Sequence, residues 1–245
     1  GADTRSFESL QKSLLIEHNF TLTGCHRCPQ SHIRLANHIV PYMKSTNENQ
    51  GKIEVVDNIM GVLLNSPTLE NEENIKHDLV ISRYNKPLVE LAYRLLKIGI
   101  PVHFVGEFGF YKMVTSLIHD YKKSSNKTEL FSEFALSEHV KYKRYMCKIR
   151  RFERLVFLEE YFSIISWLFD QAGSIKQFQD DINMLFGPET DKADCLAGFE
   201  RGTIYFSSTH KAKGDEALRV WILSPDRFLP KAFRDCPLSV HQMQQ

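Results

Sequence analysis

Residues 203–216 read Thr-Ile-Tyr-Phe-Ser-Ser-Thr-His-Lys-Ala-Lys-Gly-Asp-Glu, and this stretch does most to decide the fold. Its first part alternates like a buried strand, and hydroxyls, a histidine, two lysines and a glycine follow where that strand ends. In open α/β sheets, ligands bind at the carboxyl edge of the strands. Hydroxyls and backbone amides there can hold phosphate, and lysine adds positive charge. The acidic Glu216 suits a different partner, such as a sugar hydroxyl.

Outside this stretch, strands and helices alternate on both sides of a long helical region. Strand patterns occur at 20–23, 53–56, 78–82, 102–105 and 219–223. Helical patterns occur at 31–42 and from Pro87 to about Gly99. Further helical patterns then follow without convincing strands between them, at 111–123, 129–136, 140–170 (one helix or two) and 175–186. Ser174 is suited to cap the last helix, and Gly187-Pro188 to end it. The order predicts an α/β fold with a parallel sheet, interrupted by a helical insertion.

Composition is typical of an ordinary globular protein. The chain has 245 residues, a net charge of +1 and 42% hydrophobic residues, and no segment has the length and apolarity of a membrane span. We found no secretory signal, and five scattered cysteines suit a reducing compartment. We therefore expect a cytoplasmic protein (nuclear if eukaryotic) without a membrane partner. The start at Gly1 and the abrupt end at Gln245 suggest a piece of a longer polypeptide.

Residues 203–216 resemble motif V of the UvrD/Rep family of superfamily 1 DNA helicases, a strand followed by Thr-x-His-x-x-Lys-Gly-x-Glu. The matching positions are Thr209, His210, Lys213, Gly214 and Glu216. The resemblance implies that Thr209, His210 and Lys213 contact single-stranded DNA. It also implies that Gly214 and Glu216 help to bind ATP, with Glu216 at the ribose.

Residues 22–37 are similar to motif IV of the same family. The resemblance implies that Arg27 contacts the γ-phosphate of ATP, a role for which a guanidinium is suited through bidentate hydrogen bonds. His26 stands where the family has a tyrosine that stacks on adenine, so it offers a smaller stacking surface. Cys25, His26 and Cys28, with His32 and His38, also allow a zinc interpretation, but no second cysteine pair lies at a useful spacing.

Three further segments follow the family order. Residues 79–85 resemble a family strand that ends in Arg-x-Asn at the DNA-facing edge, which implies DNA contacts for Arg83 and Asn85. Residues 99–110 repeat the glycine, proline and phenylalanine pattern that follows this strand. Gly1-Ala2-Asp3 resembles the end of motif III.

The resemblance implies a RecA-like second motor domain made of residues 1–110 and 201–245, with a helical subdomain at 111–200. The complete enzyme would hydrolyse ATP with Mg²⁺ and move 3′ to 5′ on single-stranded DNA. The chain contains no Gly-x-x-x-x-Gly-Lys-Ser/Thr loop and no apolar strand ending in Asp-Glu. The Mg²⁺ ligands are therefore expected on a missing first RecA-like domain, and we expect the isolated chain to lack ATPase activity.

Other interpretations stay open at this level. The chain also suits a non-catalytic remnant that binds single-stranded DNA or a partner protein. A basic run with interleaved aromatic residues is either a solvated helix face or a surface for single strands: Lys141, Tyr142, Lys143, Arg144, Tyr145, Lys148, Arg150 and Arg151. We expect the aromatic side chains of the helix over 152–169, namely Phe152, Tyr161 and Trp167, to pack in the core of the insertion.

Overall fold

The computed structural model describes residues 6–15, 18, 24–38, 41–64, 76–105, 109–124, 130–187 and 203–224. These residues fall into two compact units, one up to Asp57 and one from Asn58 onward. The predicted strand at 20–23 and the motif III segment Gly1-Ala2-Asp3 lie outside the described residues.

The first unit is small and contains little regular structure. Its elements are α1 (Ser6–Ser13), β1 (Gly24–Cys25), α2 (Gln30–Ala36) and β2 (Lys44–Ser45), and β1 pairs in parallel with β2. Neither β1 nor β2 corresponds to a strand that the sequence predicted.

Two further predictions in the first unit are wrong. The helix predicted over 31–42 ends at Ala36, because the Asn37 side chain donates a hydrogen bond to the Met43 carbonyl at 2.9 Å and the chain turns there. The strand predicted over 53–56 has no regular structure. Val55 is 78% exposed, so its apolar alternation does not correspond to a buried sheet face.

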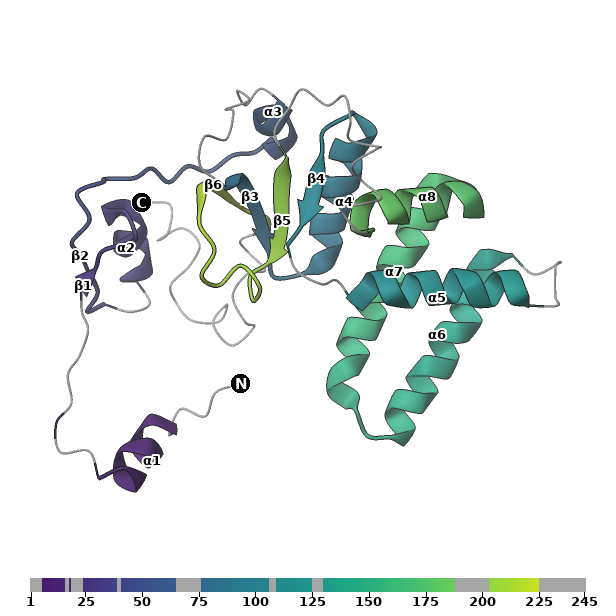
Figure 1. Ribbon diagram of the computed structural model, residues 1–245, viewed down its shortest axis with the longest axis horizontal. Helices are drawn as coiled ribbons and strands as arrows, with labels where there is room; N and C mark the ends of the chain where they lie inside the picture. The colour runs from purple at the N-terminus through teal and green to yellow at the C-terminus, as the bar shows by residue number, and fades with distance from the viewer. Residues whose placement is uncertain are drawn as a thin grey trace. The chain divides into compact units, whose positions relative to one another are not determined.

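A four-stranded parallel sheet is the centre of the second unit (Figure 1). Its strands are β3 (Lys76–Ser82), β4 (Val102–Phe104), β5 (Ile204–Ser208) and β6 (Ala217–Ile222), and their order in space is β4-β5-β3-β6. The predicted α/β class with parallel strands is confirmed. Because all four strands run in the same direction, their carboxyl ends lie at one edge of the sheet.

The second strand from the β6 edge, β3, is fixed by apolar burial and by one buried acid. Leu79 and Val80 are buried, as a continuous apolar run predicts for a strand covered on both faces. Asp78 is also buried, and its carboxylate accepts two hydrogen bonds from Arg219, at 2.9 and 2.8 Å, and one from the Trp221 indole at 2.7 Å. Asp78 stands opposite Arg219 in the ladder, so this contact also fixes the register of β6.

Helices follow β3 and β4 as the sequence predicts, but the break within the insertion is shifted. The helix α3 (Ile59–Leu64) precedes β3 and was not predicted, whereas α4 (Asn85–Lys97) was. Between β4 and β5 lie α5 (Gly109–Lys123), α6 (Phe131–Lys148), α7 (Leu155–Ala172) and α8 (Ile175–Phe186). The predicted segments 129–136 and 140–170 meet differently, because α6 runs unbroken to Lys148. The break falls after it, where Arg150 adopts a positive φ of 56° and a short 3₁₀ turn (Phe152–Arg154) follows.

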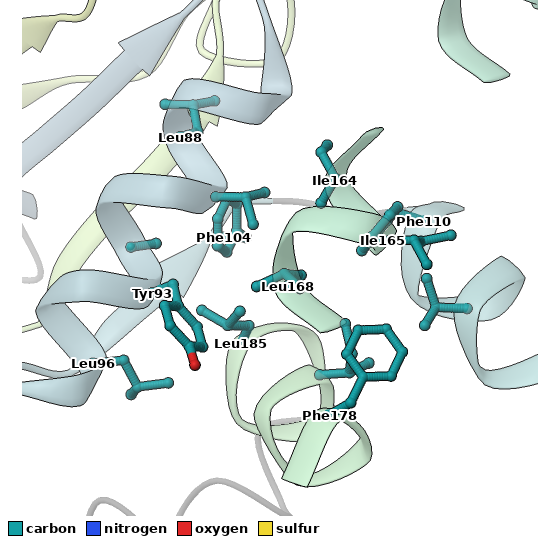
Figure 2. Close-up of a cluster of buried hydrophobic side chains, with 14 of the residues drawn as sticks. Leu88, Tyr93, Leu96, Phe104, Phe110, Ile164, Ile165, Leu168, Phe178 and Leu185 are labelled. Carbon is teal, nitrogen blue, oxygen red and sulfur yellow. The ribbon is translucent and has the colours of Figure 1, made fainter. Parts of the chain in front are cut away.

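One hydrophobic core joins the sheet to the insertion. In Figure 2, side chains of α4 and β4 meet those of α7 and α8, with Phe104 next to Leu168 and Leu185. Tyr161 and Trp167 pack against this core as predicted, and the Trp167 ring meets Tyr93 edge to face at 5.5 Å. Phe152 does not, because it lies in the turn before α7 and is 58% exposed. The predicted domain boundaries at 110 and 200 stay predictions, and both fall inside the second compact unit.

Candidate ligand-binding edge of the sheet

Two motifs that are far apart in the sequence meet at the carboxyl edge of the sheet. Ser82 and Ser208 are paired in register at the ends of β3 and β5. One residue further on, the Thr209 N–H donates a hydrogen bond to the Ser82 carbonyl at 3.0 Å. Arg83, which follows Ser82, therefore lies beside the start of the turn that Thr209 opens, and its side chain is exposed.

The turn after β5 is closed by backbone hydrogen bonds. The N–H groups of Lys211 and Ala212 both donate to the Ser208 carbonyl at 2.9 Å, and that of Asp215 donates to Ala212 at 3.0 Å. Gly214 has a φ of +96°, a conformation that residues with a Cβ rarely adopt. The sequence thus places a glycine where the backbone conformation requires one, which indicates that residues 209–216 form a specific, well-defined turn.

The side chains of this turn are mostly exposed. His210, Lys213 and Glu216 are exposed to solvent, whereas Thr209 is half-buried. Within the described residues, the Thr209 Oγ1 atom is buried and has no hydrogen-bond partner. A buried hydroxyl without a partner is costly, so a hydrogen bond from a ligand or a water at this point would stabilise the turn.

Asn85, the second predicted DNA contact after β3, is instead held by the helical insertion. The Glu160 carboxylate of α7 accepts hydrogen bonds from the Asn85 N–H at 2.5 Å, the Asn85 Nδ2 at 3.0 Å and the Lys86 N–H at 3.2 Å. The Lys86 ammonium also donates to the Ser163 hydroxyl at 2.8 Å. Glu160 thus places a negative charge at the N-terminus of α4, where the helix dipole favours one.

Sequence reasoning assigned no role to Glu160, although a signal was present. The stretch from Leu155 to Phe169 is the most apolar of the chain, and Glu159 and Glu160 are the acids that interrupt it. Glu159 is 47% exposed and pairs with Lys143 at the surface. Glu160 is half-buried and binds the N-terminus of α4, so only one of the two acids connects the insertion to the carboxyl edge of the sheet.

The predicted ATP contacts His26 and Arg27 lie in the first unit, on the turn between β1 and α2. Both side chains are exposed. The His26 Nδ1 atom lies 2.6 Å from the Thr46 hydroxyl, and the Asn47 side chain donates to the Arg27 carbonyl at 3.0 Å. Because Glu216 belongs to the second unit, a nucleotide site that Arg27 and Glu216 share stays a prediction.

The predicted basic and aromatic run lies on the second half of α6 and on the turn that leads to α7. Tyr145 is 56% exposed there, and Lys143 pairs with Glu159 of α7. The described residues contain no group of three or more His, Cys, Asp or Glu side chains that could hold a metal ion. No helix among them combines the length and apolarity needed to cross a membrane.

Comparisons with known proteins gave no relatives from which to transfer a role. The chain matches no protein-family model, no curated protein and no solved structure.

Proposed function

We propose that the chain is the second motor domain of a UvrD-type, ATP-dependent 3′–5′ DNA helicase, with a RecA-like sheet and a helical insertion. In this proposal, Arg83, Thr209, His210 and Lys213 bind the backbone of single-stranded DNA at the carboxyl edge of the sheet. ATP binds between this domain and a first RecA-like domain that provides the Mg²⁺ ligands.

The observation that supports the proposal most strongly is the hydrogen bond between Thr209 and Ser82. It joins the turn that resembles motif V to the strand end that resembles the family's DNA-facing edge, although the whole helical insertion separates the two in the sequence. Parallel strands present their carboxyl ends, and the turns after them, at one edge, which is where ligands of such sheets bind. Exposed Arg83 and Lys213 supply positive charge for phosphate, and the exposed His210 imidazole offers a hydrogen-bond donor.

The nucleotide roles follow from the motif resemblance. Arg27 would contact the γ-phosphate, His26 would lie by the adenine, and Glu216 would accept a hydrogen bond from the ribose. Gly214 would let the backbone of the turn approach the nucleotide, since glycine has no side chain and tolerates the φ of +96° found there. ATP hydrolysis would then open and close the cleft against the first domain, a hinge-type motion.

Binding of a fluorescent oligothymidylate to the whole chain, followed by anisotropy over a range of salt concentrations, tests the proposed DNA edge. The double variant Arg83→Ala, His210→Ala should bind more weakly. Its plot of log affinity against log salt should be less steep, by about 0.7 for each phosphate that the variant no longer neutralises. The matched control is Arg94→Ala, His119→Ala, which removes the same side-chain types from exposed positions on α4 and α5. No measurable binding by the wild-type chain at low salt, or an equally weakened affinity in both variants, would refute the assignment.

A second candidate function is non-catalytic binding of single-stranded DNA by the end of α6. Tyr145 is 56% exposed beside Arg144 and Lys148, and aromatic side chains between cations can stack on bases. The variant Tyr145→Ala should then weaken oligothymidylate binding by about 1–3 kcal/mol, while Arg83→Ala leaves it unchanged. The opposite pattern would favour the sheet edge.

A further inference from the structure

Cys25 and Cys28 lie at the two ends of one tight turn between β1 and α2. The Cys28 N–H donates a hydrogen bond to the Cys25 sulfur at 3.5 Å, and both side chains are half-buried thiols without a disulfide. The segment that includes β2 fixes this turn from one side. The Thr46 N–H donates to the Cys25 carbonyl at 3.0 Å, and the Ser45 hydroxyl donates to the Cys28 carbonyl at 3.0 Å.

The surroundings of Cys25 favour its thiolate form. The Cys28 N–H is the main cause of a lowered pKa for the Cys25 thiol, and partial burial opposes it. The Arg27 N–H, the Cys28 thiol and the Arg27 charge lower this pKa further. A thiolate that accepts hydrogen bonds from the N–H and the thiol of the second cysteine is a nucleophile with a resolving thiol beside it.

We propose that Cys25 and Cys28 form a redox-active dithiol that reacts with low-molecular-weight disulfides such as glutathione disulfide. The Cys25 thiolate attacks one sulfur of the disulfide, a mixed disulfide forms, and the first glutathione thiolate leaves. Cys28 then loses its proton to solvent and attacks the Cys25 sulfur, which expels the second glutathione thiolate. Two protein thiols are oxidised to one disulfide, and one glutathione disulfide is reduced to two thiols.

The alternative for two cysteines at this spacing is a metal site, and the structure favours the dithiol. Structural zinc needs four ligands, and the described residues contain no cluster of three or more His, Cys, Asp or Glu side chains. The imidazole of His26, which lies between the two cysteines in the sequence, already contacts the Thr46 hydroxyl through its Nδ1 atom at 2.6 Å.

Oxidation would also constrain the residues between the two cysteines. In the oxidised form, Arg27 lies inside the ring that the disulfide closes, so its backbone is fixed on both sides.

Differential alkylation of the whole chain in glutathione redox buffers, with each cysteine followed by peptide mass, tests the proposal. Cys25 and Cys28 should become protected together with one midpoint, whereas the exposed single Cys147 should stay open to alkylation under the same conditions. The variant Cys28→Ser should accumulate the mixed disulfide at Cys25. Cys25 in this variant should react with glutathione disulfide at pH 7 about tenfold faster than Cys147.

Three results would overturn the proposal. The first is equal protection of Cys25 and Cys147 in every buffer. The second is a mixed disulfide on Cys28 in Cys25→Ser that forms as fast as that on Cys25 in Cys28→Ser. The third is stoichiometric zinc in the purified chain, with alkylation of both cysteines only after a chelator is added. Each variant changes one sulfur to oxygen at a half-buried position, so circular dichroism can verify that both keep the fold.

Discussion

Removing the Glu160 carboxylate should destabilise the second unit much more than removing the carboxylate of its neighbour Glu159. In Glu160→Ala, the N–H groups of Asn85 and Lys86 and the Asn85 amide lose a charged acceptor. Hydrogen bonds to charged groups contribute about 1.5–3 kcal/mol, and a charge at a helix N-terminus adds about 0.3–1 kcal/mol. At this half-buried site, water can replace some of the lost hydrogen bonds, so we expect Glu160→Ala to lower the free energy of unfolding by about 2–4 kcal/mol. For Glu160→Gln, which keeps an acceptor but loses the charge, we expect a loss of about 1 kcal/mol.

Urea unfolding followed by tryptophan fluorescence measures this change selectively. The chain has two tryptophans, Trp167 and Trp221, and both lie in the second unit. The neighbouring variant Glu159→Ala is the matched control, because the Glu159 carboxylate is 47% exposed and its contacts with Lys143 and His139 should contribute little to stability. If Glu160→Ala and Glu159→Ala unfold at the same urea concentration, the carboxylate does not hold α4 as described.

Two further predictions concern buried charge and backbone conformation. Burial alone would lower the pKa of Lys97, but its hydrogen bond and charge contact with the buried Asp181 raise it, so the folded state holds this proton more tightly than the unfolded state. The stabilisation from the Lys97–Asp181 contact should therefore be fully present below the ordinary lysine pKa of 10.5, and it should be lost as the pH rises through the pKa of Lys97 in the folded state. In urea titrations across that pH range, Asp181→Asn should remove most of this alkaline loss of stability. Gly214→Ala should lower the free energy of unfolding by about 1–2 kcal/mol, because alanine is strained at a φ of +96°. Gly109→Ala is the control and should be near neutral in the same assay, because neither glycine has an atom within 4 Å of an added Cβ and only Gly214 of the two has a positive φ. Equal destabilisation by the two variants would refute the strain argument.

Sequence reasoning succeeded where the signal is local. The apolar run of β3 and the Ser174 cap of α8 each depend on a few adjacent residues, and the cap is confirmed by the Gln177 N–H that donates to the Ser174 hydroxyl at 3.2 Å. The strand pattern at 53–56 failed because alternation has meaning only when a neighbouring strand and a core are present. Asn85 shows a second limit, since its partner Glu160 lies 75 positions away and no local pattern links the two.

In the candidate site, too, the features that depend on local sequence could be predicted and the distant contacts could not. Placing Arg83 and Thr209 at one edge required only that both follow parallel strands, and the paired ends of β3 and β5 meet that condition. The deeper anchoring of this edge was not predictable, because the carboxylate that fixes α4 comes from the insertion. The motif resemblance supplied roles for single residues but no information about which helix would support them.

The strand order β4-β5-β3-β6 also constrains how the chain can be assembled. β3 and β4 are made early, yet neither is the other's neighbour, and the strand between them follows the whole insertion. At about 5–20 residues per second, a ribosome needs roughly 6–25 s to get from Ser82 to Ser208. During that interval the backbone of β3 has neither of its two final partners, β5 and β6, so nascent chains have an open template for wrong pairing. The helices of the insertion follow one another in the sequence and are complete before β5 is made, so they can pack with one another during this interval.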